Sequence, residues 1–209
     1  MTLRTLIFAA LACSAVALAQ AVDTPFQVRY AANLSVGDSV INVTNSGANG
    51  ASLQSGTTAS ITGSLCVNVY AFSPDEQMVS CCSCPVTPNG LVSLSVRNDL
   101  VSNTLTPAVP TAVVVKLLAT VPVAGSCTNS AAAVTTATLA PGMLAWGTTI
   151  HATPVAGSYG VTETAFSPAT LSAGELSRIG NLCNFILANG SGFGVCRSCR
   201  LGGLGADKL

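Results

Sequence analysis

Cysteine accounts for most of the chemistry that this sequence could perform. Three cysteines crowd into the segment SCCSCPVTPNG, residues 80–90, and a C-x-x-C pair follows near the end of the chain, Cys196 and Cys199. Thiols at such spacings serve structural disulfides, a thiolate zinc site or dithiol redox catalysis. The compartment in which the chain folds decides between these uses.

The first nineteen residues predict export. Arg4 precedes an apolar run over residues 6–18, and residues 17–19 match the small-x-small pattern that signal peptidase cleaves. The run is too short to span a membrane. We therefore expect residues 1–19 to be removed and the mature chain to be secreted, periplasmic or extracellular.

The charge of the mature chain excludes several classes of partner. Removal of residues 1–19 takes away one arginine and one cysteine, which leaves seven basic residues, eight acidic residues and eight cysteines. Such a small and balanced set of charges argues against nucleic acid and anionic membranes as partners. Because copies with few charges repel each other little, self-association or another extracellular protein is the partner class that remains.

Disulfides are the first interpretation of the eight remaining cysteines. An oxidising compartment and an even count both favour them, although eight cysteines allow 105 pairings. If residues 77–84 form a strand, Cys81 faces the opposite side from Cys82 and Cys84, so these cysteines reach different partners. The candidates are Cys66, Cys81, Cys82, Cys84, Cys127, Cys183, Cys196 and Cys199.

The parity of the cysteines adds one constraint. Five lie in the β-rich part of the chain and three in the C-terminal part, so full pairing requires at least one bridge between the two parts. We expect one local bridge, from Cys183 to Cys196 or Cys199, and a crossing bridge from the cysteine that remains.

Two alternatives use free thiols. A zinc site would take Cys82, Cys84, Cys196 and Cys199 as ligands, but only one C-x-x-C pair is present and zinc knuckles usually have two. A redox dithiol at Cys196 and Cys199 would have Arg197 beside it to lower a thiol pKa. Such dithiols normally begin a helix, however, whereas this pair follows one.

The rest of the mature chain reads mainly as β-strands. Apolar and polar residues alternate with a period of two, as expected where one face of a strand is buried, and turn residues separate the segments. Residues 111–120 are apolar on both faces, which indicates a central strand. The expected strands lie within residues 25–36, 37–50, 60–77, 77–90, 91–101, 111–120, 143–153 and 158–166.

One helix is expected near the C-terminus. Apolar residues recur at helical spacing over residues 173–188, Ser172 and Glu175 form a capping box, and Asn189-Gly190 is a helix-ending signal. Its apolar stripe must pack on the β-layer. The sequence thus predicts a mainly-β, antiparallel sandwich-like domain over residues 20–170. The helix and a Cys/Gly-rich tail, residues 171–209, are tied to it covalently, and the chain is loose after Cys199.

Single residues that could mark a site were also considered. His151, the only histidine, is expected on a strand and half exposed, because no serine-elbow motif accompanies it. Trp146 is expected in the core, with sugar stacking as the alternative. Gly190, Gly192 and Gly194 follow a helix, so they are interpreted as an exit loop and not as a phosphate loop.

The sequence therefore favours a secreted, disulfide-stabilised structural, adhesive or assembly-type protein without catalytic activity or cofactor. The alternative is an exported thiol-disulfide oxidoreductase or a zinc-stabilised module that uses Cys196 and Cys199.

Overall fold

The computed structural model describes residues 23–51, 62–197 and 199–201. The expected signal peptide, residues 1–19, lies outside this part of the chain. Among the described residues, no helix is both long and apolar enough to cross a membrane.

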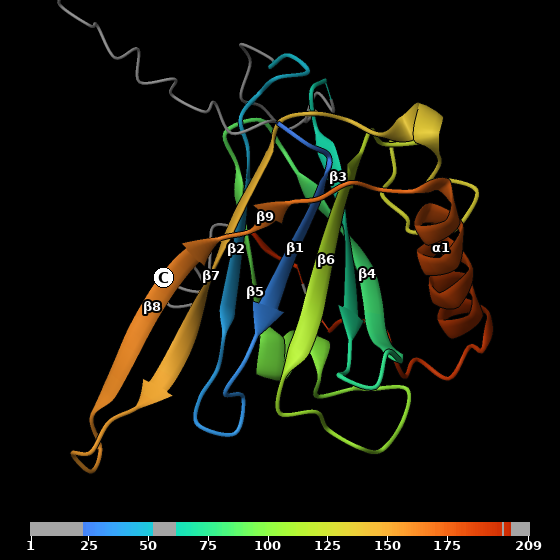
Figure 1. Ribbon diagram of the computed structural model, residues 1–209. Coiled ribbons are helices and arrows are strands. Elements are labelled where there is room, and N and C mark those ends of the chain that lie inside the picture. Colours follow the sequence, from blue (N-terminus) through green and yellow to red (C-terminus); the bar gives the residue numbers. More distant parts are fainter. Residues whose placement is uncertain (1–22, 52–61, 198, 202–209) are drawn as a thin grey trace, which may run out of the picture.

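The strands form two five-stranded antiparallel sheets that face each other (Figure 1). Sheet A has the order β4-β3-β6-β1-β9, with bounds Met78–Val86, Leu65–Phe72, Val113–Thr120, Phe26–Ala31 and Ser167–Pro168. Sheet B has the order β10-β5-β2-β7-β8, with bounds Arg200–Leu201, Leu91–Ser95, Val40–Asn45, Met143–Ala152 and Tyr159–Ala165. The expected antiparallel β-class is confirmed, and each expected segment contains a strand.

The segment expected as a strand over residues 91–101 is shorter than predicted. It ends at Ser95, and Val96–Leu100 forms a π-helical turn. The Ser95 hydroxyl accepts the N–H of Asn98 at 2.9 Å, and the Asp99 carboxylate accepts the N–H of Ser95 at 2.7 Å. These side chains offer the backbone partners that a neighbouring strand would otherwise supply, so the strand stops there.

The core between the sheets follows from the alternation along each strand. Leu65, Val67 and Val69 of β3 point toward sheet B, where they meet buried residues such as Ile41 and Leu94. The central strand β6 is buried on both faces, as its sequence predicts: Val115 and Leu117 enter this core, whereas Leu118 points to the other side of sheet A.

A helix forms a third layer on the outer face of sheet A (Figure 1). Helix α1, Ala173–Ala188, has the predicted bounds, and the Ser172 hydroxyl caps it by accepting the N–H of Glu175 at 3.1 Å. Its stripe of Leu176, Ile179, Cys183 and Ile186 packs on Phe26, Tyr70, Phe72, Met78 and Leu118. The helix therefore covers a second core.

Tyr70 provides a test of this second core. Its side chain is fully buried, and none of the described residues gives its hydroxyl a hydrogen-bond partner. Burial raises the pKa of Tyr70 above its ordinary value, since the ionised form is poorly solvated there.

We predict that Tyr70→Phe leaves the free energy of unfolding at pH 7 unchanged within about 1 kcal/mol, or raises it. The folded state resists ionisation of the tyrosine, so the parent keeps its stability below pH ~10 and loses it as the pH rises further, whereas phenylalanine has no proton to lose. The variant should therefore lose less stability than the parent above that pH. Rapid denaturant titrations from pH 7 to 11 measure this difference. A loss of more than about 2 kcal/mol at pH 7 would show that the hydroxyl has a partner.

Candidate functional site

Strand β4 carries three cysteines, and its alternation directs them to two sides. Cys81 points to the helix layer and is bonded to Cys183, with a Cα–Cα distance of 5.8 Å. Cys82 and Cys84 point to the core between the sheets and are bonded to Cys196 and Cys199, at Cα–Cα distances of 5.4 and 5.5 Å. Three bridges therefore tie the C-terminal part of the chain to one strand.

The expected local bridge from Cys183 to Cys196 or Cys199 is wrong. Cys183 lies on the buried stripe of α1, directly over Cys81, and the chain then leaves the helix and passes the edge of β4. All three C-terminal cysteines consequently pair with β4, where the parity of the sequence required only one crossing bridge.

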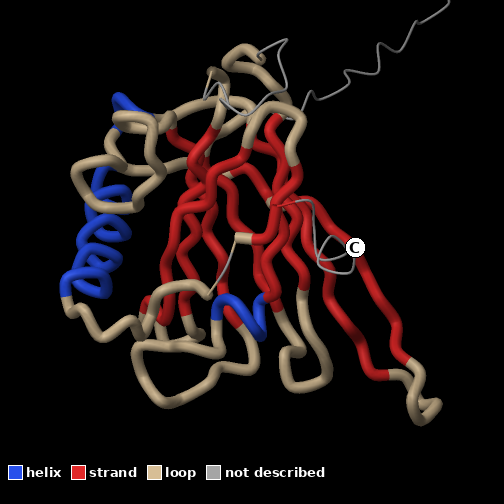
Figure 2. The backbone as a smooth tube through the Cα atoms, turned by 180° about the vertical axis from the view of Figure 1, so that it is seen from behind, coloured by secondary structure: helices blue, strands red, loops and turns tan. Residues whose placement is uncertain are grey.

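The segment after α1 follows the edge of β4. The N–H of Cys81 donates to the carbonyl of Gly194 at 2.8 Å, and the N–H of Cys196 donates to the carbonyl of Cys81 at 3.3 Å. Gly194 has a φ of 79°, and a Cβ atom there would lie 2.8 Å from Ile186 Cγ2, so only glycine fits. Figure 2 shows this segment on the flank of the sandwich opposite the β7–β8 hairpin.

The tail also reaches sheet B. Arg200 and Leu201 form β10, which pairs with Ser93 and Val92 of β5, so the chain is not loose directly after Cys199. Residues 202–209 lie outside the described part. One C-terminal segment thus covers the β4 edge of sheet A and the β5 edge of sheet B.

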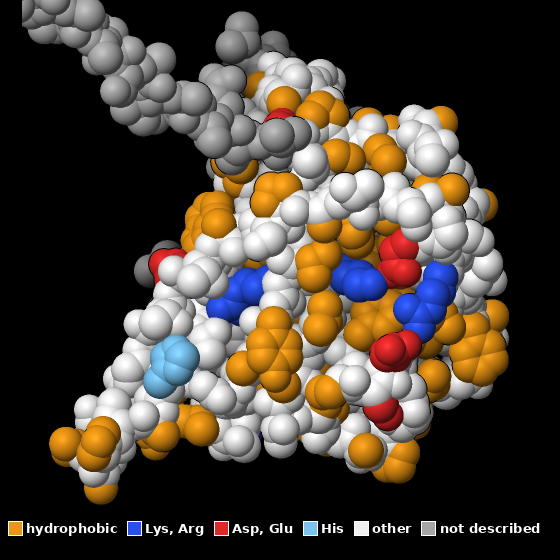
Figure 3. Space-filling view, in the orientation of Figure 1, with side chains coloured by type: hydrophobic (Ala, Val, Ile, Leu, Met, Phe, Trp, Pro, Cys, Tyr) orange, Lys and Arg blue, Asp and Glu red, His pale blue; other side chains and the backbone are white. Residues whose placement is uncertain are grey.

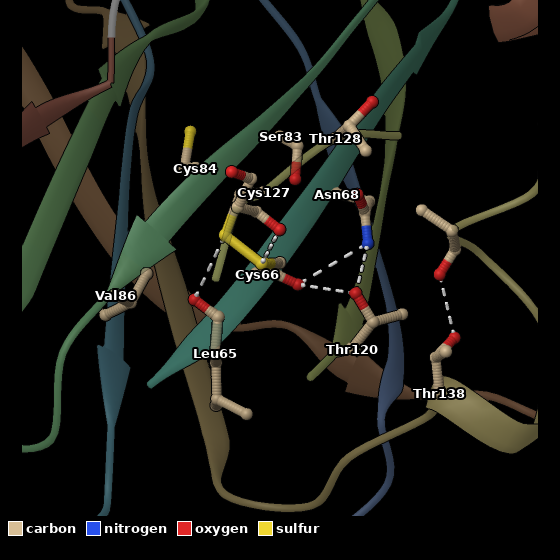
Figure 4. The surroundings of a disulfide bond; sticks show 12 residues. Leu65, Cys66, Asn68, Ser83, Cys84, Val86, Thr120, Cys127, Thr128 and Thr138 are labelled. Atoms are coloured by element: carbon tan, nitrogen blue, oxygen red, sulfur yellow. Dashed lines mark hydrogen bonds between the residues drawn. A yellow bond between two sulfur atoms is a disulfide. The ribbon is translucent and has the colours of Figure 1, made fainter. Parts of the chain in front are cut away.

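The fourth bridge lies at the start of β3 (Figure 4). Cys66 is bonded to Cys127, with a Cα–Cα distance of 5.2 Å, which fixes the long connection after β6 to the outer face of sheet A. Beside it, the buried amide of Asn68 donates to the hydroxyl of Thr120 and to the carbonyl of Leu118, both at 3.0 Å. The amide nitrogen beside this bridge is therefore satisfied, whereas the buried Oδ1 of Asn68 has no partner among the described residues.

The cysteines expected for zinc do lie close together. The Sγ atoms of Cys82, Cys84 and Cys199 are within 4.8 Å of one another, and Cys196 is bonded to Cys82. In this structure the four sulfurs belong to two disulfides, and Cys196 and Cys199 are not bonded to each other. A metal or redox role would require a reducing partner first.

The single residues named from the sequence lie elsewhere. His151 is exposed on β7, where its Nε2 lies 3.0 Å from the Thr162 hydroxyl. Trp146 was expected in the core, but it is half-buried on the outer face of sheet B, because Met143 and Ala145 take the inward positions. Gly190, Gly192 and Gly194 form the exit loop, as predicted.

A feature that sequence reasoning missed lies on the opposite flank. Strand β8 is the outermost strand of sheet B, and six of its seven residues are exposed. Tyr159 is 57% exposed and Val161 63% exposed. The hairpin of β7 and β8 projects from the body at the lower left of Figure 3, where hydrophobic and uncharged atoms predominate. The sparse apolar residues of SYGVTETAF hint at exposure on both faces, but they do not reveal an edge position.

A buried arginine holds the base of this hairpin. Arg29 of β1 is 7% exposed, and its guanidinium donates to the hydroxyls of Thr149 at 2.7 Å and of Thr164 and Ser39 at 3.2 Å. Burial lowers the pKa of Arg29. A Cβ atom on Gly147 would lie 2.9 Å from the guanidinium, so the glycine makes room for it. Sheet A thereby fixes β7 and β8 where they leave the sandwich.

No family model, curated protein or solved structure matches this chain.

The two neighbouring bridges on β4 lead to a prediction about stability. While Cys82–Cys196 is intact, removing Cys84 and Cys199 opens only a short ring, and we expect a loss of about 2 kcal/mol. When Cys82, Cys84, Cys196 and Cys199 are all changed to Ala, no bridge closes the loop of 13 residues that runs from Cys183 to position 196. The total loss in the free energy of unfolding then rises to about 5 kcal/mol. Guanidinium unfolding of the oxidised variants measures both values. The prediction would be contradicted if the variant without Cys84 and Cys199 were as unstable as the variant without all four cysteines.

Proposed function

We propose that the chain is a secreted, disulfide-reinforced structural protein of the adhesive or assembly type, without catalytic activity of its own. The observation that carries this proposal is the contrast between its two flanks. One flank is closed by a covalently bonded tail, whereas the other presents the long strand β8. Exposed edge strands are sites at which further strands add.

Two further features support an assembly role. The four disulfides reinforce a body that must withstand an extracellular environment. The full sequence also has eight basic and eight acidic residues in 209, so electrostatic repulsion between copies is weak. A reinforced body and weak repulsion between copies both favour incorporation of the protein into a larger structure.

Sedimentation velocity of the oxidised protein tests the proposal. We predict that the weight-average sedimentation coefficient rises between about 1 µM and about 200 µM, where contacts of modest area associate. Because strand addition rests on backbone hydrogen bonds and not on ion pairs, added salt should change the association little. A monomer over the whole range would contradict the assembly role.

The clustered sulfurs support a second candidate, a zinc-stabilised module in the reduced protein. An external dithiol would donate two electrons and two protons to each of two bridges, leaving thiols at Cys82, Cys84, Cys196 and Cys199. Four thiolates could then bind one Zn²⁺ with release of their protons.

Native mass spectrometry separates the two candidates. The structural proposal predicts a protein that is purified with all eight cysteines bridged, about 8 Da lighter than its reduced form, and that takes up no zinc after mild reduction. The second candidate predicts one Zn²⁺ per chain once the two bridges are open, and loss of that ion in a Cys84→Ser, Cys199→Ser variant.

A further inference from the structure

The hydrogen-bonding pattern of the hairpin shows which groups of β8 are free to pair. The N–H of Phe166 donates to the carbonyl of Ala145 at 2.8 Å, so these two residues form a hydrogen-bonded pair. The register is unbroken, so Thr162, four residues before Phe166, also forms a hydrogen-bonded pair with its partner Thr149. Antiparallel pairs alternate between bonded and non-bonded, so the backbone groups of Tyr159, Val161, Glu163 and Ala165 point away from β7.

The bonds on the opposite edge of β7 confirm which backbone groups face away from β8. The carbonyl of Ile150 accepts the Asn33 amide at 3.1 Å, and the carbonyl of Thr148 accepts the Ser39 hydroxyl. Both carbonyls therefore face away from β8. Their partners in the register, Val161 and Glu163, present their own backbone groups to the outer edge for the same reason.

The outward groups of β8 are complementary to those of a second β8 strand. In an antiparallel pair with its two-fold axis at Thr162, Val161 faces Glu163 of the second copy and Tyr159 faces Ala165 of the second copy. Every outward-pointing residue then lies in a hydrogen-bonded pair, and all seven residues of the strand are paired.

Other registers are less favourable. A shift of one residue sets outward groups opposite inward ones. A shift of two residues in one direction places Glu163 directly opposite Glu163 of the second copy, which is destabilising. A shift of two in the other direction takes the pairing into the hairpin turn, where the N–H of Ser158 already donates to the carbonyl of Val155.

Apart from the charge of Glu163, strand β8 also lacks the features that normally protect an edge. Its sequence YGVTETA contains no lysine or proline, and its pairing with β7 shows no bulge. The bonds from Arg29 and Asn33 hold the hairpin, which lowers the entropy lost when a partner binds.

We infer that two copies of this chain associate through β8, in the antiparallel register centred on Thr162, so that their B sheets form one continuous sheet. This inference rests on the assembly role proposed above and names its contact. An isologous contact of this kind closes on itself and gives a dimer.

A charge-exchange series at positions 161 and 163 tests the register, with sedimentation equilibrium of the oxidised proteins as the measurement. Val161→Glu creates two Glu–Glu pairs across the axis and should weaken association roughly fivefold. Val161→Lys creates two Lys–Glu pairs and should strengthen it by a similar factor, about fivefold. Adding Glu163→Lys to Val161→Glu should restore or exceed the parental affinity.

Val155→Glu serves as the matched control, because Val155 is 67% exposed in the hairpin loop and lies outside the paired strand. It should leave the dissociation constant unchanged. The three positions changed, 155, 161 and 163, are exposed in the monomer, and an unreduced mass with four bridges confirms that each variant has folded.

The outcomes separate this inference from the proposed function. If the parent associates but the substitutions at positions 161 and 163 do not change the dissociation constant, the β8 register is wrong. The same holds if the double variant does not regain the parental affinity. The assembly role then rests on another surface. If the parent stays monomeric at the highest concentration, the assembly role itself fails, and the inference fails with it.

Discussion

A β-strand presents successive side chains to opposite faces, and on β4 this alternation applies to three cysteines at once. Cys81 must bond on the helix side of sheet A, whereas Cys82 and Cys84 must bond on the side of sheet B. One chain segment supplies all three partners, so it has to begin on one side of the strand and end on the other. The route of the helix, the glycine loop and the tail follows from that requirement.

The same route determines which edges of the two sheets are covered. As the C-terminal segment passes β4, its backbone bonds Cys81, and it then adds β10 to β5. On the opposite flank, the chain crosses from β8 to β9 through the buried Phe166, which closes only the base of the hairpin. Beyond that crossing, Arg29 and its three hydroxyl partners support β7 and β8 without covering them. The molecule is consequently closed on one side and open on the other.

Local sequence pattern was sufficient for most of the fold. The period of two located the strands from β1 to β8, and the capping box at Ser172 gave the helix its bounds, because both signals arise from neighbours within a few residues. The π-helical turn after Ser95 was missed because the side chains of Ser95 and Asp99 bond backbone N–H groups there and compete with the ladder. The strands β9 and β10, of two residues each, are too short to have a period.

The candidate sites depended on contacts between distant residues, which the sequence does not encode locally. The count of cysteines required a crossing bridge, but the pairing of Cys183 with Cys81 depends on where α1 crosses β4. The open edge of β8 was equally inaccessible, because strand order within a sheet is a property of the whole chain. Even Trp146 illustrates this limit: alternation places it on one face of β7, but only the partner sheet decides which face is buried.

The bridges of β4 span 102, 114 and 115 residues, and this spacing has a consequence for the order in which the bridges can form. Because a chain is synthesised from its N-terminus, Cys81, Cys82 and Cys84 are present well before Cys183, Cys196 and Cys199. Until then, the only native partner within reach of any earlier cysteine is Cys127, which belongs to Cys66. The three thiols of β4 therefore stay without their native partners for longer and can form wrong disulfides with each other. A folding catalyst that reverses such disulfides would matter more for this chain than for one with local bridges.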